Sequence, residues 1–421
     1  MEEQNPWWSG EADDEYLKWK NSEIRWIPPI LEKFDFKPFS LNFLVGPRQV
    51  GKTTALKIFI NEYLLKKINP KAVFYYSCDE LTDFRELSEV LDNYLSYRER
   101  FKIKSSFIIL DEITFVNEWY RAIKYRIDRG KFERDVLIIT GSASLELLQQ
   151  RETFPGRRGY GKDIFFYPLS FQEFFDIFWS REVVRCESLL EIDKRMRVNS
   201  IFSESVSEAF SIYLKTGGFP LPIIDYFSKG RISNLTKKAY IDWIKSDLAK
   251  VGKSERYAKE VLAFILRARC APVSWLSISK ETSIASPHTA QSYVEMLERL
   301  FIIKILYFLS PKGRILYRKN KKIHIIDPFI YKCLAEYTRE NIEESQILES
   351  VVAAHLSRKF PTYYWRNGSE VDLVVLENRK QIGIEVKTRA GPWRKPRHLD
   401  KVLILDKQNI GTFLISLDLK E

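Results

Sequence analysis

The sequence is poor in cysteine and lacks long apolar runs. Its four cysteines among 421 residues lie far apart and form no CxxC pair, which argues against zinc ribbons and disulfide scaffolds. No stretch of about 18 apolar residues occurs, since even FIIKILYFL is short and contains a lysine. The start, MEEQNPWWSGEADDEY, is acidic and polar, unlike a signal peptide. We therefore expect a cytoplasmic protein with no membrane partner.

The composition supports globular domains and leaves the partner open. Hydrophobic residues make up 45% of the chain and charged residues 29%, so a disordered or fibrous chain is excluded. The length predicts about three domains. Sixty-seven basic and 56 acidic residues give a net charge of +11. This excess is compatible with a nucleic acid, with an acidic membrane, or with no polyanionic partner at all.

Short apolar segments alternate with helical ones in the first part of the chain. The expected strands are Leu41–Val45, Ala72–Tyr76, Phe107–Leu110, Val136–Thr140 and Ile164–Tyr167. Strands that alternate with helices predict an α/β domain with a parallel sheet. After about residue 170 the pattern becomes helical, and from about residue 341 helices and strands mix again.

A phosphate-binding motif follows the first expected strand. The segment matches GxxxxGK[ST] at every fixed position and consists of Gly46, Pro47, Arg48, Gln49, Val50, Gly51, Lys52 and Thr53, followed by Thr54. Glycines let backbone N–H groups surround phosphates, the lysine reaches the β- and γ-phosphates, and the threonine binds Mg²⁺. A chance glycine-rich turn is the competing interpretation. The motif predicts ATP and Mg²⁺ as cofactors.

Polar residues end two later strands. Asp111 and Glu112 end the third, where the first carboxylate can hold the metal and the second can polarise the attacking water. An ordinary acidic strand end is the alternative. Thr140 and Ser142 end the fourth, where they would meet the γ-phosphate, cap the next helix, or do both.

Several segments together resemble the AAA+ ATPases of an archaeal and bacterial group that carries a C-terminal nuclease-like domain. The segments are GPRQVGKTT, IILDE, LIITGSAS, PGRR and PLSFQEF. The resemblance implies Walker A at 46–53, Walker B at Asp111 and Glu112, and sensor 1 at 140–142. It also implies a homo-oligomer, such as a hexameric ring, with an arginine finger at Arg157 or Arg158. Solvated loop arginines are the alternative for both positions.

Residues 255–327 suggest three helices and a two-stranded wing, which is the pattern of a winged helix. The segment 301–322 holds seven basic residues and no acidic one. The predicted DNA contacts are Lys312, Arg314, Arg318, Lys319, Lys321 and Lys322. Protein docking is the alternative use of such a module.

The C-terminal part matches the PD-(D/E)xK nuclease pattern. Asp372 lies on one expected strand, and Glu385 and Lys387 project together from the next. The carboxylates would bind a divalent metal and the lysine would position a water. Glu349, on a preceding helix, takes the place of the pattern's additional acid. The leading proline and a Gln-x-x-x-Tyr helper are absent, and a hairpin with exposed charges is the alternative.

Together these observations predict an α/β protein with four parts. They are an AAA+ P-loop core (1–170), a helical lid (171–252), a winged helix (253–335) and a small PD-(D/E)xK α/β domain (336–421). The expected function is ATP hydrolysis coupled to duplex or branched DNA, with metal-dependent cleavage, in DNA processing or repair. The alternatives are an ATP-driven DNA motor and a signalling scaffold whose nuclease-like domain only binds.

Overall fold

The computed structural model describes residues 1–421 apart from 35, 142–146, 148–152, 368, 388–394 and 419–421. The chain divides into two compact units, Met1–Tyr167 and Pro168–Glu421. No helix in the described ranges combines the length and the hydropathy of a membrane span.

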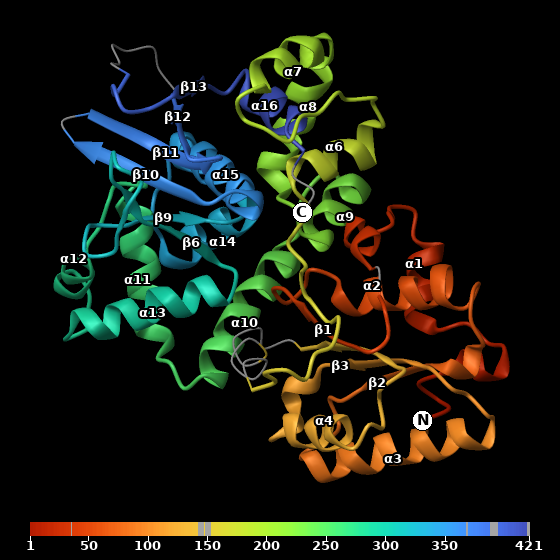
Figure 1. The fold of residues 1–421 in the computed structure, drawn as a ribbon. Helices are drawn as coiled ribbons and strands as arrows, with labels where there is room; N and C mark the ends of the chain where they lie inside the picture. The colour runs from red at the N-terminus through yellow and green to blue at the C-terminus, as the bar shows by residue number, and fades with distance from the viewer. Residues whose placement is uncertain (35, 142–146, 148–152, 368, 388–394, 419–421) are drawn as a thin grey trace. The chain divides into compact units, whose positions relative to one another are not determined.

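The first unit is built on a parallel five-stranded sheet in the order β2-β3-β4-β1-β5 (Figure 1). Its strands are β1 (Ser40–Val45), β2 (Val73–Ser77), β3 (Phe107–Asp111), β4 (Val136–Thr140) and β5 (Asp163–Phe165). Its helices are α1 (Asp14–Asn21), α2 (Lys52–Ile58), α3 (Phe84–Arg100) and α4 (Trp119–Asp128), with the π-helical turn η3 (Phe59–Leu64) continuing α2. The predicted parallel sheet is confirmed, with strand bounds shifted by at most two residues.

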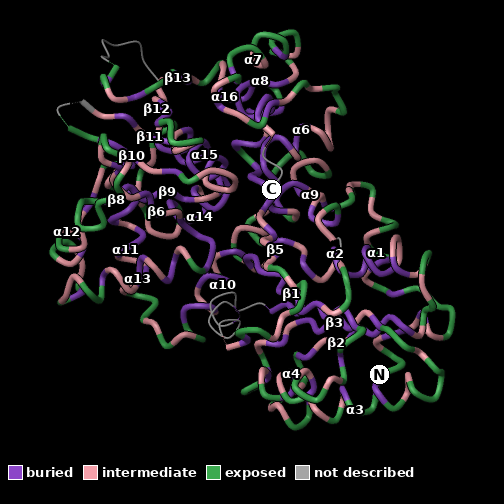
Figure 2. The backbone as a smooth tube through the Cα atoms, in the orientation of Figure 1, coloured by how far each residue is buried: buried purple, intermediate pink, exposed green. Residues whose placement is uncertain are grey.

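The core of this unit explains why these segments are strands. Every residue of β1 and β4 is buried, as expected for parallel strands covered on both faces (Figure 2). Helix α3 contributes Leu87, Leu91 and Tyr94, spaced along one face, to the interior. Asp83 caps this helix by accepting hydrogen bonds from two backbone N–H groups of its first turn.

The second unit combines a helical region with a mixed sheet. Its helices are α6 (Phe171–Trp179), α7 (Ile192–Asn199), α8 (Ser203–Thr216), α9 (Pro220–Lys229), α10 (Asn234–Lys250), α11 (Glu255–Arg267), α12 (Trp275–Lys280), α13 (Pro287–Arg299), α14 (Pro328–Thr338), α15 (Glu344–Lys359) and α16 (Ile410–Ser416). Its strands are β6 (Ile303–Leu306), β7 (Phe308–Leu309), β8 (Ile315–Leu316), β9 (Lys322–Ile325), β10 (Thr362–Asn367), β11 (Ser369–Glu377), β12 (Lys380–Val386) and β13 (Lys401–Leu405).

Where we expected a wing of two strands, the structure has four short strands. β6 pairs with β9 and β7 pairs with β8, both antiparallel. The change occurs at Tyr307, whose carbonyl accepts a hydrogen bond from the backbone N–H of Tyr364, so that β7 joins β10 instead of prolonging β6. The six-stranded sheet β13-β12-β11-β10-β7-β8 therefore crosses the boundary that we predicted at residue 335.

The C-terminal helix lies among helices from the start of the same unit (Figure 1). α16 packs against α6, α7 and α8, and the backbone N–H of Cys186 bonds to the carbonyl of Ser416 over 3.0 Å. Asn199 donates to the Ser416 hydroxyl at 2.9 Å. The segments predicted as lid and as nuclease-like domain thus share one interior, and our four-part division of the chain stays a prediction.

Candidate functional site

The phosphate-binding loop connects β1 to α2. Gly51 precedes the helix with a φ of 94°, a conformation that glycine adopts without strain. A Cβ atom at Gly46 would lie 2.3 Å from the carbonyl oxygen of Phe166, so no larger residue fits there. Gly51 is therefore required by the backbone of the loop, and Gly46 by the close approach of Phe166.

Lys52 is buried in this loop. Its Nζ donates to the carbonyl oxygens of Gly46 and Pro47, both at 2.9 Å. Both acceptors are neutral backbone groups of the loop. A buried cation beside the first turn of a helix fits a phosphate group.

A hydroxyl and a carboxylate meet beside the loop. Thr53 donates from Oγ1 to Oδ2 of Asp111, the last residue of β3, at 2.7 Å. Asp111 is buried, and burial raises the pKa of its carboxyl, while the bond from Thr53 acts in the opposite direction. Adjacent hydroxyl and carboxylate oxygens are hard ligands, so these two residues fit Mg²⁺.

Glu112 follows with a φ of 54° and donates its backbone N–H to Oδ1 of Asp111 at 3.0 Å. Thr140 ends β4, which lies between β3 and β1, and its buried hydroxyl has no hydrogen-bond partner among the described residues. The edge of the sheet thus brings together the polar strand ends that we predicted. Ser142 lies outside the described residues.

The two candidate finger arginines bind carboxylates of their own chain. Arg157 donates from Nε to Asp128 at 2.7 Å in an exposed pair. Arg158 contacts Asp163 at 2.8 Å, and its guanidinium lies 4.9 Å from the centre of the Phe43 ring. An exposed ion pair contributes little energy, so Arg157 is the easier of the two to release.

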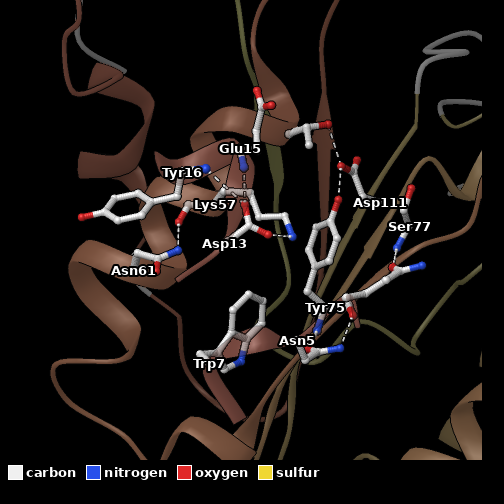
Figure 3. A network of polar contacts seen from close by, with 12 residues as sticks. Asn5, Trp7, Asp13, Glu15, Tyr16, Lys57, Asn61, Tyr75, Ser77 and Asp111 are labelled. Carbon is white, nitrogen blue, oxygen red and sulfur yellow. Dashed lines mark hydrogen bonds and ion pairs between the residues drawn. The ribbon is translucent and has the colours of Figure 1, made fainter. Parts of the chain in front are cut away.

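Asp111 is supported by residues that we did not predict from the sequence. Tyr75, on β2, donates its hydroxyl to Oδ2 of Asp111 at 2.9 Å (Figure 3). Lys57 lies 3.4 Å from the centre of the Tyr75 ring and forms a buried ion pair with Asp13 at 2.8 Å. Thr54, expected at the nucleotide, instead donates to Glu15 at 2.9 Å. The one feature of the sequence that could have indicated the contact between Tyr75 and Asp111 is the position of Tyr75 on a predicted strand of the same sheet.

In the second unit, three of the predicted acids come together. Asp372 on β11 accepts from the backbone N–H of Val386 on β12 at 2.9 Å. The pKa of Glu385 is raised to about 7, mainly by burial and also by the nearby charge of Asp372. Glu349 comes from α15, and burial raises its pKa to about 8. Lys387 follows β12 and is half-buried.

Lys322 lies in the middle of these acids, and not at the surface where we expected a DNA contact. Its Nζ is 2.9 Å from Glu349, 2.8 Å from Glu370 and 2.9 Å from Asp372, and its side chain is 1% exposed. Burial alone lowers the pKa of Lys322, but the carboxylates outweigh it and hold the pKa well above the usual range. Lys321 is buried as well, over the ring of Trp275. As placed here, neither lysine can reach a DNA backbone.

The other four predicted DNA contacts are exposed. They lie on the β7–β8 turn and the segment after it, and they are Lys312, Arg314, Arg318 and Lys319. We call these four residues the basic turn. On the preceding helix, α13, Ser286 acts as the N-cap and Pro287 occupies the first turn.

We call Glu349, Glu370 and Asp372, which surround Lys322, the acidic cluster. Two further groups lie beside it. His324 is buried on the same strand as Lys322, and burial lowers its pKa to about 3. Its Nε2 lies 3.9 Å from Glu349 and has no hydrogen-bond partner in the described part of the chain. Ligand atoms of Cys270, His324 and Glu349 lie within 4.8 Å of one another.

Comparison with known families agrees with this geometry. Residues 39–175 match the model of an AAA domain. This part of the chain is an AAA-type P-loop ATPase domain. Two domains of unknown function, DUF8612 and DUF4143, match residues 207–341 and 344–411, and neither description assigns an activity. ATP and Mg²⁺ are thus implied for the AAA-type domain, whereas the nuclease assignment is not supported by these matches.

The descriptions of individual relatives do not indicate an activity. An uncharacterized protein of Methanocaldococcus jannaschii is 26% identical over 341 residues, covering 75% of this chain and 67% of the relative. An uncharacterized protein of Haemophilus influenzae is 23% identical over 302 residues, covering 68% and 67%. Among solved structures, a Walker-type ATPase of Pyrococcus abyssi aligns over 70% of this chain and 90% of its own, with 17% identity and a TM-score of 0.41.

Proposed function

We propose that this protein hydrolyses ATP and that nucleotide turnover controls a second unit that binds nucleic acid without cutting it. The observation that carries the ATPase part is the meeting of Lys52, Thr53 and Asp111 at one edge of a parallel sheet. In this proposal Lys52 turns from the loop carbonyls to the β- and γ-phosphates. Thr53 and Asp111 hold Mg²⁺, which neutralises charge on the phosphates, and Glu112 orients the attacking water.

An arginine from a second copy would complete the site. Arg157 is the better candidate, because its pair with Asp128 is exposed and inexpensive to break. Arg158 is held by Asp163 and by the Phe43 ring. We therefore propose a homo-oligomer, such as a ring, in which Arg157 reaches the γ-phosphate of a neighbouring molecule.

The basic turn is the proposed nucleic-acid contact. Its four cations are exposed and close together in the chain, and they follow the winged-helix-like arrangement of α11, α12 and α13. Cations on a turn can lie against phosphates and provide affinity without reading bases. We propose duplex DNA as the partner, and a winged helix and a PD-(D/E)xK-like sheet as the parts of the second unit.

The acidic cluster favours binding over cleavage. Metal-dependent cleavage requires that Glu349, Asp372 and Glu385 share a divalent ion. Here Glu349 and Asp372 instead bind the ammonium of Lys322. The signalling or scaffold alternative for the C-terminal part is thus better supported than a nuclease.

The ATPase proposal is tested by steady-state hydrolysis with Lys52→Ala. We expect a loss on the order of a thousandfold, because the cation that faces the phosphates is removed. The matched control is the double variant Lys66→Ala/Lys67→Ala, which removes two exposed lysines of the same unit and should hydrolyse ATP like the parent. Equal rates for the parent and Lys52→Ala would refute the ATPase proposal.

The nucleic-acid proposal is tested by fluorescence anisotropy with labelled duplex DNA across a salt series. Arg318→Ala/Lys319→Ala should bind more weakly. The plot of log K against log salt should become less steep by roughly two, about one for each cation removed. Lys66→Ala/Lys67→Ala changes the net charge equally and should keep the parent slope. If both double variants lose affinity equally, only bulk charge is involved and the basic turn is not the contact.

A further inference from the structure

We propose that Lys322 is a built-in cation that takes the place of a divalent metal ion in the acidic cluster of Glu349, Glu370 and Asp372. The inference rests on the non-cutting role proposed above for the second unit and names the device that imposes it. The metal that the PD-(D/E)xK pattern implies therefore does not fit the cluster as this chain builds it.

The geometry of the ammonium group is the first argument. A lysine ammonium has three N–H donors and no acceptor. Nζ of Lys322 has a carboxylate oxygen at 2.9 Å from Glu349, one at 2.8 Å from Glu370 and one at 2.9 Å from Asp372. The number of donors equals the number of carboxylates, so the cation is fully coordinated by the cluster.

The second argument is that two cations cannot share these oxygens. Mg²⁺ and Ca²⁺ bind carboxylate oxygens at about 2.0–2.6 Å. An ion at that distance from Glu349 and Asp372 would lie next to an ammonium that already touches both carboxylates. The ammonium cannot withdraw into solvent as placed, since the Lys322 side chain is 1% exposed. Metal binding would thus require either expulsion or deprotonation of a buried lysine.

The neighbours of Lys322 include Cys270 and His324. Their ligand atoms and that of Glu349 lie within 4.8 Å of one another. Glu385 lies on β12 and Lys387 follows directly after that strand. Lys322 is the cation that touches Glu349, Glu370 and Asp372 together.

The position of Lys322 in the chain shows how the cation is delivered. It is the first residue of β9, which pairs with β6 and packs against α15. Alternation along β9 places Lys322 and His324 on one face, toward the helix that carries Glu349. The strand belongs to the segment that we expected to bind DNA, while the acids come from the segment that we expected to cut it. The lysine therefore joins these two segments.

The test is a Mn²⁺ titration of the full-length protein without nucleotide, followed by isothermal titration calorimetry and by thermal unfolding. The variant Lys322→Met removes the charge but keeps an unbranched side chain. It should gain one Mn²⁺ site, at least about tenfold tighter than any site of the parent, because the freed carboxylates become oxygen ligands. The matched control, Lys322→Met/Asp372→Asn, should lose the gained site.

Two outcomes would overturn the inference. One is Mn²⁺ binding by the parent protein that the single substitution Asp372→Asn abolishes. The other is a folded Lys322→Met variant that gains no Mn²⁺ site. If Lys322→Met unfolds without metal, Mn²⁺ must restore its thermal transition, and failure to do so also counts against the inference.

DNA anisotropy and a cleavage assay on the same preparations separate this inference from the proposed function. A parent that does not bind DNA refutes the nucleic-acid role and leaves the Mn²⁺ result standing. Mn²⁺-dependent cutting by the parent that Asp372→Asn abolishes would refute both the non-cutting role and the inference.

Discussion

Two of the buried lysines, Lys52 in the first unit and Lys322 in the second, have different acceptors. Lys52 is bound by two backbone carbonyl oxygens, and Lys322 by three carboxylates, all at 2.8–2.9 Å. The carbonyl acceptors of Lys52 carry no net charge. The carboxylates neutralise Lys322 and hold it in place. The comparison thus sets a lysine that donates to neutral carbonyls against one that is held by three acids.

The largest expected effect of this difference is on stability. Lys322→Met should lower the free energy of unfolding by about 4 kcal/mol, because it leaves buried carboxylates without a counter-charge. Lys52→Ala should lower it by only about 1 kcal/mol, because it leaves neutral carbonyls. Urea unfolding of both full-length variants, followed by circular dichroism, measures the two values. Equal losses would show that the acceptors do not distinguish the lysines.

A buried carboxylate without a lysine among its hydrogen-bond donors extends the comparison. Asp327 caps α14 by accepting from the backbone N–H groups of Phe329 and Ile330, and it also accepts from Gly218 at 2.8 Å. Burial raises its pKa to about 6 from an ordinary 3.8, although these N–H groups act in the opposite direction. A Cβ atom at Gly217 would lie 2.2 Å from Oδ1 of Asp327, so Gly217 is required by the close approach of this carboxylate.

The raised pKa predicts a pH dependence. Between about pH 4 and pH 6 the folded state keeps a proton on Asp327 that the unfolded state has released, so stability falls as the pH rises. The contribution amounts to at most about 3 kcal/mol and is complete above about pH 6. Asp327→Asn cannot titrate and should lack this part of the decline in urea unfolding measured from pH 4 to pH 7. Parallel pH profiles for parent and variant would contradict the assignment.

The smallest expected effect concerns the support of Asp111. Tyr75→Phe removes one of the two hydroxyl donors to Oδ2, the other being Thr53. We expect the Mg²⁺ concentration for half-maximal ATPase activity to rise about fivefold, which is about 1 kcal/mol, with little change in thermal stability. Tyr76→Phe, the next residue on β2, is the control and should match the parent. A lower maximal rate at an unchanged Mg²⁺ requirement would show that Tyr75 does not position Asp111.

Much of the first unit could be predicted from the sequence, because its signals are local. Parallel strands buried on both faces are continuous apolar runs, and β1 and β4 have this composition. The residues of the phosphate-binding motif are contiguous in the chain, and Gly51 is required by the local backbone. The motif can therefore be recognised from the sequence, whereas the reason for Gly46, the close approach of Phe166, is visible only in the structure.

The role of Lys322 could not be predicted in the same way. Its basic neighbours from 312 to 319 suggested an exposed surface, yet the partners of Lys322 are 27 to 50 residues further along the chain. Lys322, Ile323, His324 and Ile325 alternate along β9, which places the two polar residues on one face of the strand. Only the packing of β9 against α15 shows that this face is interior.

The first residues of the chain have a consequence for assembly. β2 is an edge strand, and side chains from the start of the chain bond to its outer backbone groups. Trp7 and Trp8 donate to the carbonyl of Val73. Asn5 donates to the backbone carbonyl of Tyr75 and accepts from its backbone N–H. An open edge of this kind readily pairs with strands of other molecules and leads to aggregation. The N-terminal segment occupies that edge with indole and amide groups that cannot propagate a sheet. Copies of the chain are thereby prevented from joining through β2.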